Sequence, residues 1–147
     1  MNKTKQTLAA IISLIIILMF SGSVSAQVCT GYYTIDDVDT SGYIAAVSGC
    51  TEITGDLMIG ASDSLTSLSG LENMTRVGGS LYIGYNDALT SLSGLENITS
   101  IGGKLHIYFN GSLTSLSGLD NITSIGGLLH INYNFARTSL SGLVNIT

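Results

Sequence analysis

Apolar positions recur through most of the chain with a period of 24 residues. Four copies of the pattern align without a gap, the last one residue short, over residues 53–76, 77–100, 101–124 and 125–147. The heptapeptide Leu-Thr-Ser-Leu-Ser-Gly-Leu recurs at the same place in the first three copies, from Leu65, Leu89 and Leu113. Arg137 replaces its first leucine in the fourth copy. A gap-free period of this length is typical of a solenoid, in which each repeat forms one coil.

Each coil is expected to contain three short extended segments. The first is an apolar–variable–apolar triplet, the alternation of a half-buried strand, at residues 57–59, 81–83, 105–107 and 129–131. In the first coil the second segment lies within residues 66–71 and the third around residues 74–77. Paired glycines, such as Gly78 and Gly79, follow the third segment, where the chain must turn sharply. No stretch shows a convincing helical period, so the coils are expected to be almost entirely strand and turn.

The inward side chains of each coil are expected to form one layer of the core. In the second coil this layer consists of Leu81, Ile83, Leu89, Leu92, Leu95, Ile98 and Ile101. Burial within a single coil releases less free energy than ordering the backbone of that coil costs. Stacking must supply the remainder, so the prediction is an all-β solenoid of about four coils.

The N-terminal segment has the three parts of a secretory signal peptide. Two lysines precede the apolar run 8–20, which only Ser13 interrupts, and small side chains follow as far as Ala26. The run is shorter than the roughly 20 residues that a membrane-spanning helix needs. Residues 1–26 are therefore predicted to be removed on secretion, with an uncleaved membrane anchor as the alternative.

The charge balance narrows the kinds of partner. The chain has 5 basic and 10 acidic residues, and without the leader the count is 3 against 10, a formal charge of −7. Nucleic acids and anionic membranes require clustered cations to neutralise phosphate. Neither is therefore expected to bind this chain.

The two cysteines are expected to form a disulfide bond. Cys29 and Cys50 are the only cysteines, and in an exported chain an even count indicates pairing. Closing a loop of about 20 residues would stabilise the fold by about 3 kcal/mol. A metal site with two cysteine ligands is the alternative, but no histidine or second cysteine pair lies near either residue.

Three features of the sequence are similar to features of a known family. They are Cys29, the segment Cys50-Thr51-Glu52-Ile53-Thr54-Gly55-Asp56-Leu57-Met58-Ile59, and the repeats of Leu-Thr-Ser-Leu-Ser-Gly-Leu-Glu-Asn and Ile-Gly-Gly-x-Leu-x-Ile. Over residues 29–147 the chain resembles the receptor L domain, the leucine-rich, right-handed β-solenoid that forms the ligand-binding lobes of the insulin and epidermal growth factor receptors. The chain is also similar to fungal cell-wall glycoproteins of the sporulation type and to secreted microbial proteins. The resemblance implies a disulfide-closed capping segment at residues 27–52 and a leucine-rich-repeat-like solenoid at residues 53–147.

The resemblance does not extend to receptor signalling. The sequence shows no cysteine-rich module, transmembrane helix or kinase beside the solenoid. Its repeats are far more regular than those of the animal receptors, which favours the microbial or fungal cell-surface branch. Because Thr147 lies inside the fourth coil, we expect the solenoid either to be truncated there and to continue in a longer protein, or to associate end to end at this edge.

The outward positions of the first segment and the positions two residues on vary most between coils. In a solenoid, variable side chains on a constant frame are where recognition is expected, and tyrosine and histidine are effective contact residues. Ordinary solvated side chains are the alternative. The candidate binding residues are Met58, Tyr82, His106, Tyr108, His130 and Asn132. The two histidines would lie on adjacent coils, but without a third ligand they do not predict a metal site.

Five asparagines match the N-glycosylation acceptor pattern, namely Asn73, Asn97, Asn110, Asn121 and Asn145. Four of them, all except Asn110, occupy the same position in successive coils. For these four we favour the alternative that they form a hydrogen-bonded ladder inside the stack, where a glycan could not attach. Asn110 belongs to another row, with Asn86 and Asn134, in which it alone forms a sequon. A chance match is the simpler interpretation for Asn110.

Two further rows of polar residues recur once per coil, Thr66, Thr90, Thr114 and Thr138 beside Ser67, Ser91, Ser115 and Ser139. Such rows could bind ice or a saccharide surface, but hydrogen bonds that hold the coils in register are the favoured interpretation. Arg137 would be costly in an inward position, which predicts that the fourth coil is distorted or near an end of the solenoid.

The capping segment holds an acidic cluster, Asp36, Asp37 and Asp39, which predicts a solvated turn or a weak cation site and does not match a calcium loop. No nucleophile, base and orienting group recur within reach of one another, so neither an enzyme nor a cofactor is predicted. The sequence predicts a secreted or cell-surface recognition or adhesion module that binds a protein or a glycan on one solenoid face. A structural spacer of the cell envelope is the alternative.

Overall fold

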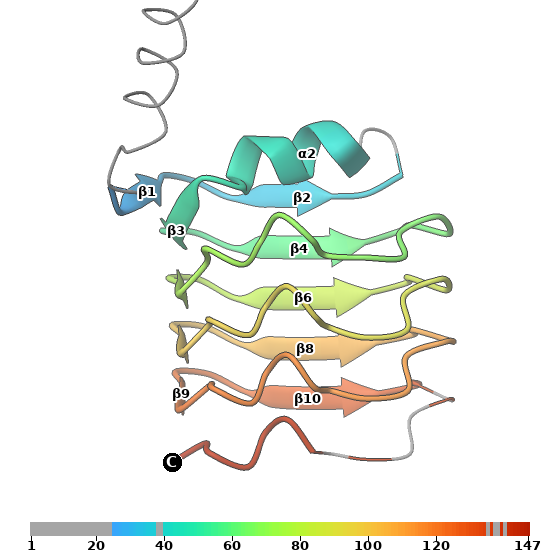
Figure 1. Ribbon diagram of the computed structural model, residues 1–147. Helices are drawn as coiled ribbons and strands as arrows, with labels where there is room; N and C mark the ends of the chain where they lie inside the picture. The colour runs from blue at the N-terminus through green and yellow to red at the C-terminus, as the bar shows by residue number, and fades with distance from the viewer. Residues whose placement is uncertain (1–24, 38–39, 135, 137–138, 140) are drawn as a thin grey trace, which may run out of the picture.

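The chain folds as a stack of coils that follow one another along a single axis (Figure 1). The computed structural model describes residues 25–37, 40–134, 136, 139 and 141–147. Most of the predicted leader, residues 1–24, lies outside this part of the chain, and so do Asp39, Arg137 and Thr138. The strands of the described residues pair in parallel, as expected of a solenoid in which each coil repeats the path of the one before.

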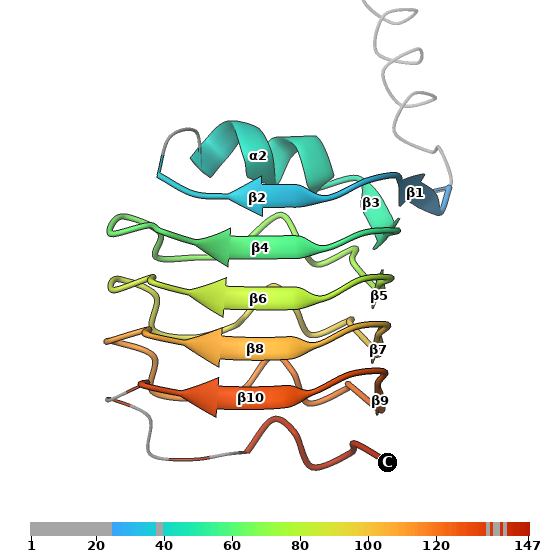
Figure 2. The ribbon, with the colours of Figure 1, turned by 180° about the vertical axis from the view of Figure 1, so that it is seen from behind.

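The longer strands lie side by side in one sheet, as Figure 2 shows. In order across this long sheet they are β2 (Tyr33–Ile35), β4 (Leu57–Gly60), β6 (Leu81–Gly84), β8 (Leu105–Tyr108) and β10 (Leu129–Asn132). From β4 to β10 each residue pairs with its equivalent one repeat later, so that Leu57 lies beside Leu81. The predicted first segment of every coil is therefore confirmed as a strand.

The shorter strands form a second parallel sheet at one edge of the coils (Figure 1). Its order is β1 (Gln27–Cys29), β3 (Cys50–Ile53), β5 (Arg76–Val77), β7 (Ser100–Ile101) and β9 (Ser124–Ile125). These strands coincide with the predicted third segment. After each of β5, β7 and β9 a Gly-Gly turn leads directly into the next strand of the long sheet.

The second predicted segment is not a strand, which corrects the sequence analysis. In the first coil, residues 66–68 have no regular structure and a turn at residues 69 and 70 follows, in which the N–H of Leu71 bonds to the carbonyl of Leu68 at 3.2 Å. Gly70 adopts a φ of 108°, a conformation that an L side chain rarely takes. Leucines spaced by three residues still point inward here, since a tight turn repeats its orientation every three residues.

One layer of apolar side chains per coil makes a continuous core. All seven residues predicted for the second coil are at most 1% exposed. Because leucine and isoleucine occupy equivalent places in successive coils, each layer lies on a layer of the same shape. The predicted solenoid of about four coils, almost entirely strand and turn, is confirmed.

The capping segment contains a helix that the sequence pattern did not predict. The helix α2 (Thr40–Val47) lies across the N-terminal end of the stack (Figure 1). Val47 is buried and Ile44 packs against the core, while Ala45 and Ala46 are exposed. A helix of eight residues is too short for a helical period to stand out in the sequence. No helix among the described residues has the length and apolar character needed to cross a membrane.

The predicted disulfide bond is present and closes the capping segment. Cys29 at the end of β1 is bonded to Cys50 at the start of β3, with a Cα–Cα distance of 5.7 Å. The bond joins the first strand of the short sheet to the strand beside it. It therefore closes a loop within the capping segment, from β1 to the strand that leads into the first coil.

Candidate functional site

The outward row of the long sheet carries most of the predicted binding residues. Leu and Ile of each strand point into the core, so the residue between them points out. The strand register places Met58, Tyr82, His106 and His130 beside one another on β4, β6, β8 and β10. The second outward row begins with two glycines and continues with Tyr108 and Asn132.

Contacts join these side chains into one surface, which we call the sheet-face strip: Met58, Tyr82, His106, Tyr108, His130 and Asn132. The imidazoles of His106 and His130 stack at 4.6 Å between ring centroids, with 2° between their planes. His106 also stacks on Tyr108 at 4.2 Å and meets Tyr82 edge-on at 6.3 Å. Its Nε2 lies 3.3 Å from Oδ1 of Asn132. Met58, next to Tyr82 in register, is 42% exposed.

Tyr108 occupies space that a glycine leaves open. A side chain at Gly84 would place its Cβ 2.5 Å from the Tyr108 ring, so the ring lies over the backbone of the preceding coil. Partial burial, together with the neighbouring Tyr85 and Tyr82 hydroxyls, raises the pKa of Tyr108. The phenol therefore stays neutral and can donate or accept a hydrogen bond at ordinary pH.

A second aromatic row, which the sequence analysis missed, borders the sheet-face strip. We call it the corner ladder: Tyr85, Phe109 and Tyr133, each directly after a strand of the long sheet. Phe109 stacks on Tyr85 at 5.0 Å and on Tyr133 at 4.5 Å, with 7° and 6° between planes. Tyr85 also meets Tyr108 edge-on at 5.3 Å, so ladder and strip are continuous.

The corner ladder depends on an unusual backbone conformation. Tyr85, Phe109 and Tyr133 have φ values of 57°, 50° and 53°, and Ala61 has 57° at the same place in the first coil. Left-handed backbone at a bulky residue costs about 1–3 kcal/mol. This turn sends the aromatic ring outward and the following asparagine inward. An aromatic residue recurring at the repeat spacing in the last three coils was the signal that could have revealed the ladder.

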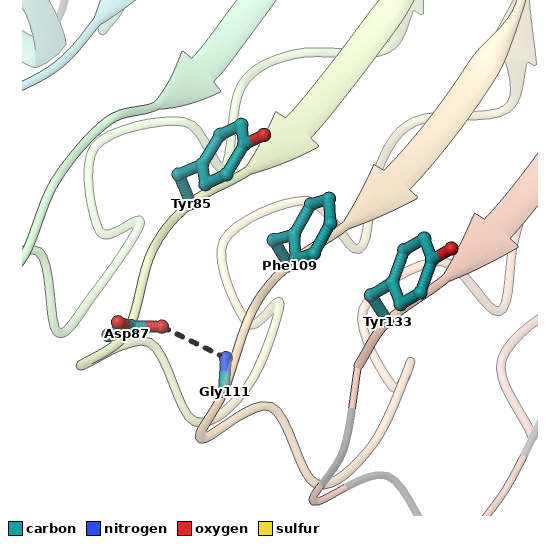
Figure 3. Close-up of a pocket in the computed structure, with 5 residues that line it drawn as sticks. All are labelled: Tyr85, Asp87, Phe109, Gly111 and Tyr133. Atoms are coloured by element: carbon teal, nitrogen blue, oxygen red, sulfur yellow. Dashed lines mark hydrogen bonds between the residues drawn. The ribbon is translucent and has the colours of Figure 1, made fainter.

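The corner ladder forms one wall of a groove, shown in Figure 3. The groove has a volume of about 350 Å³ and is lined by the three rings together with Asp87 and Gly111. Oδ1 of Asp87 accepts a hydrogen bond from the N–H of Gly111 at 3.3 Å, which holds the carboxylate beside the groove. The rings are 54%, 37% and 55% exposed from Tyr85 to Tyr133, so a ligand can reach them.

The ladder of asparagines inside the stack is made of residues other than those favoured by the sequence analysis. Asn86 and Asn110 are fully buried. The side-chain nitrogen of Asn110 donates to the carbonyl of Ile83 at 3.1 Å and to Oδ1 of Asn134 at 3.0 Å. Its Oδ1 accepts from the backbone and side-chain nitrogens of Asn86 at 3.3 and 3.0 Å. A folded coil therefore has no room for a glycan on Asn110, which corrects its place among the acceptor candidates.

The other four acceptor candidates form an outer ladder. Their side chains are exposed, and each side-chain nitrogen donates to a carbonyl of the preceding coil, at 2.6 Å from Asn97 to Glu72 and 2.7 Å from Asn121 to Glu96. Asn73 and Asn145 make the equivalent bonds at 3.0 and 2.6 Å. The expected hydrogen bonds are present, but the expected position inside the stack is wrong. Burial does not protect these four residues, and their glycosylation stays a prediction.

The hydroxyls of the serine row pair within their own coils, and in the threonine row Thr114 bonds across a coil boundary. Thr114 donates to the carbonyl of Thr90 in the preceding coil at 3.2 Å, whereas Ser115 pairs with Ser117 in its own coil at 2.8 Å. A further threonine row, at residues 51, 75, 99, 123 and 147, bonds across every coil boundary from the first strand onward. Cross-coil bonding thus falls mostly on a row that the sequence analysis did not single out.

Asp37 of the acidic cluster binds the turn of the first coil. Its carboxylate accepts hydrogen bonds from the hydroxyls of Ser62 and Ser64 and from the N–H of Asp63, the last at 2.7 Å. Chiefly through the Ser62 bond, these contacts lower the pKa of Asp37 to about 2. Among the described residues no group of three or more histidine, cysteine, aspartate or glutamate side chains could hold a metal ion.

Comparison with known proteins adds one finding. Residues 49–111 match the family model of the receptor L domain. The match runs from Gly49, directly before β3, to the turn that carries Gly111. It includes most of the sheet-face strip and the first two rings of the corner ladder. Neither curated proteins nor solved structures give a significant match.

Proposed function

We propose, from the receptor L-domain family to which residues 49–111 belong, that this chain binds a macromolecular ligand on the outer face of its long sheet. The family is non-enzymatic and receptor-type, its members lie outside the cell or on its surface, and they bind protein ligands. A protein is therefore the partner we favour, with a glycan as the alternative. The proposed location is extracellular or on the cell surface.

The proposal rests on the row of Tyr82, His106 and His130, whose rings contact one another from strand to strand. The rest of each coil repeats with little change, whereas this row changes from methionine on β4 to tyrosine on β6 and to histidine on β8 and β10. Such side chains present large contact area with few rotatable bonds, which suits a binding hot spot. Mutual stacking holds the rings in place before a ligand arrives and reduces the entropy lost on binding.

A binding assay with variants of this row tests the proposal. The purified protein would be presented to a glycan array and to cell-surface proteins, beside Tyr82→Ala and His106→Ala. We expect a specific ligand whose affinity falls by about 2 kcal/mol or more in both variants, as for a hot-spot residue. Arg76→Ala is the matched control, because Arg76 lies on the short sheet, where it pairs with Glu52 at 3.2 Å.

Two results would count against binding at the sheet face. If the folded protein captures no ligand, the structural spacer predicted as the alternative becomes the better account. If Arg76→Ala weakens capture as much as Tyr82→Ala, recognition involves another surface. Circular dichroism of each variant would establish that the β-fold is intact, so that a loss of capture reports on the surface.

A further inference from the structure

The groove beside the corner ladder is separate from the residues that carry the proposed sheet-face function. Three coils contribute to it, and it runs along the solenoid axis (Figure 3). One wall consists of the rings of Tyr85, Phe109 and Tyr133, and the other is the turn with Asp87 and Gly111. Its volume of about 350 Å³ lies at the lower end of the range for sites that enclose small groups. A single long side chain fits such a space better than a bulky ligand does.

The ring wall offers apolar contact along its length. Phe109 is stacked on both faces, by Tyr85 and by Tyr133, so its edge is what remains for a ligand. The exposed edge of this middle ring favours an aliphatic chain lying across it, whereas a flat sugar or a stacked cation needs an open ring face. The left-handed backbone at each ring keeps this wall in place at an energetic cost.

The opposite wall supplies a negative charge at one end. Asp87 is exposed, and its Oδ1 is held by Gly111, while a carboxylate has the capacity for about four hydrogen bonds. Asp63 occupies the equivalent place in the preceding coil, so carboxylates succeed one another along this turn. The described basic residues lie elsewhere, with Lys104 before the start of β8 and Arg76 on the short sheet. The groove therefore favours a cation.

We propose that the groove receives a lysine or arginine side chain of a protein partner, with its aliphatic stem against the corner ladder and its charged head on Asp87. Lysine and arginine combine an apolar stem with a cationic end, which matches the two walls. The proposal rests on the proposed function as a protein-binding module. The ring contact between Tyr85 and Tyr108 makes the groove continuous with the sheet-face strip, so one partner can reach both.

Peptide titration followed by NMR tests this site directly. The probes are Ac-Gly-Lys-Gly-NH2 and Ac-Gly-Arg-Gly-NH2, with Ac-Gly-Gln-Gly-NH2 as the neutral control and maltohexaose as a neutral saccharide. We expect the basic peptides to shift the amide signals of residues 85–87 and 109–111 with millimolar affinity. Added salt should weaken this binding, because the ion pair is exposed.

Matched variants separate the two walls. Asp87→Asn should weaken binding about 2- to 5-fold, as expected for an exposed ion pair. Asp63→Asn removes the same charge one coil earlier, outside the groove lining, and should leave affinity almost unchanged. Phe109→Ala removes the middle ring and should weaken binding about 2- to 10-fold. Tyr82→Ala, on the sheet face, should have no effect on these peptides.

Three outcomes would overturn the proposal. They are the absence of shifts with either basic peptide, equal binding of the glutamine peptide or maltohexaose, and equal effects of Asp87→Asn and Asp63→Asn.

The groove proposal and the sheet-face proposal can fail separately. If the basic peptides do not bind while Tyr82→Ala still abolishes capture of a protein ligand, only the groove assignment is wrong. If they bind the groove while no ligand engages the sheet face, only the sheet-face function is wrong.

Discussion

At the scale of single residues, two asparagine rows with the same spacing have opposite environments. Asn110 is fully buried, and both ends of its amide are bonded to adjacent coils or to its own coil. Asn97 is exposed and makes one bond, to the carbonyl of Glu72. Asn86, at the end of the inner row, has a buried Oδ1 without a hydrogen-bond partner among the described residues, since Ser62 stands where the preceding coil would carry an asparagine.

The inner row should contribute far more to stability than the outer one. Asn110→Ala removes the partners of Asn86 and of the Ile83 carbonyl inside the core. Because buried polar groups left unpaired are costly, we expect the free energy of unfolding to fall by about 2–4 kcal/mol. Urea-induced unfolding would measure the change.

Asn97→Ala serves as the control for this substitution. It removes one hydrogen bond at the surface, where water can replace it, and should cost about 1 kcal/mol or less. Equal losses in the two variants would contradict the distinction between a buried and an exposed ladder.

At the scale of elements, each connection between short strands has to be held by its own contacts. Strands of the short sheet have two residues from β5 onward, too few to define a path alone. The turns that follow the long sheet are held by the buried asparagine row. In the first coil, which lacks that asparagine, Asp37 of the capping segment bonds to the turn at Ser62 and Ser64 instead.

Attachment of the capping segment should depend on pH through Asp37. Its pKa of about 2 lies below the ordinary value of 3.8, so the ionised form stabilises the folded state. This contribution is complete above about pH 4 and is lost as the pH falls towards 2, because protonation removes the acceptor. We expect the unfolding midpoint in urea to fall over this range.

The variant Asp37→Asn measures how much of the pH dependence of the unfolding midpoint comes from this one carboxylate. The variant should start with a lower midpoint at neutral pH and show a smaller decrease between pH 4 and 2 than the wild type. Asp36→Asn is the neighbouring control. If Asp37→Asn and the wild type respond identically to acid, the turn does not depend on the ionised carboxylate.

At the scale of the whole molecule, stability is distributed along the stack. Each coil pairs only with the coils directly before and after it, in both sheets. In such an arrangement the ends are the weakest parts, because a terminal layer lacks one neighbour. The capping segment, with α2 and the disulfide bond, covers the N-terminal end of the core (Figure 1).

The disulfide bond should contribute measurably to this arrangement. It links residues 21 positions apart, and a loop of that size stabilises by about 3 kcal/mol through the entropy of the unfolded chain. The double variant Cys29→Ala/Cys50→Ala should therefore lower the free energy of unfolding by about that amount, measured with urea under non-reducing conditions. An unchanged midpoint would show that the capping segment is held by its other contacts.

The repeat made much of the fold accessible from sequence. Identical spacing of Leu81, Ile83 and their equivalents determines which side chains face inward and forces successive coils into the same register. The outward row of Tyr82 and His106 followed from the same alternation. These features depend on local periodicity, and any error in register would expose the core.

The features that the repeat does not reveal depend on the direction of the backbone at the turns. The left-handed conformation after each strand sends Tyr85 outward and Asn86 inward, and neighbouring coils then stack the rings and bury the amides. Sequence spacing is the same for Asn86 and Asn97, so it could not tell the inner ladder from the outer one. Alternation along a strand therefore determined the core and the sheet-face strip, whereas the groove and the ladders exist because separate coils bring their turns together.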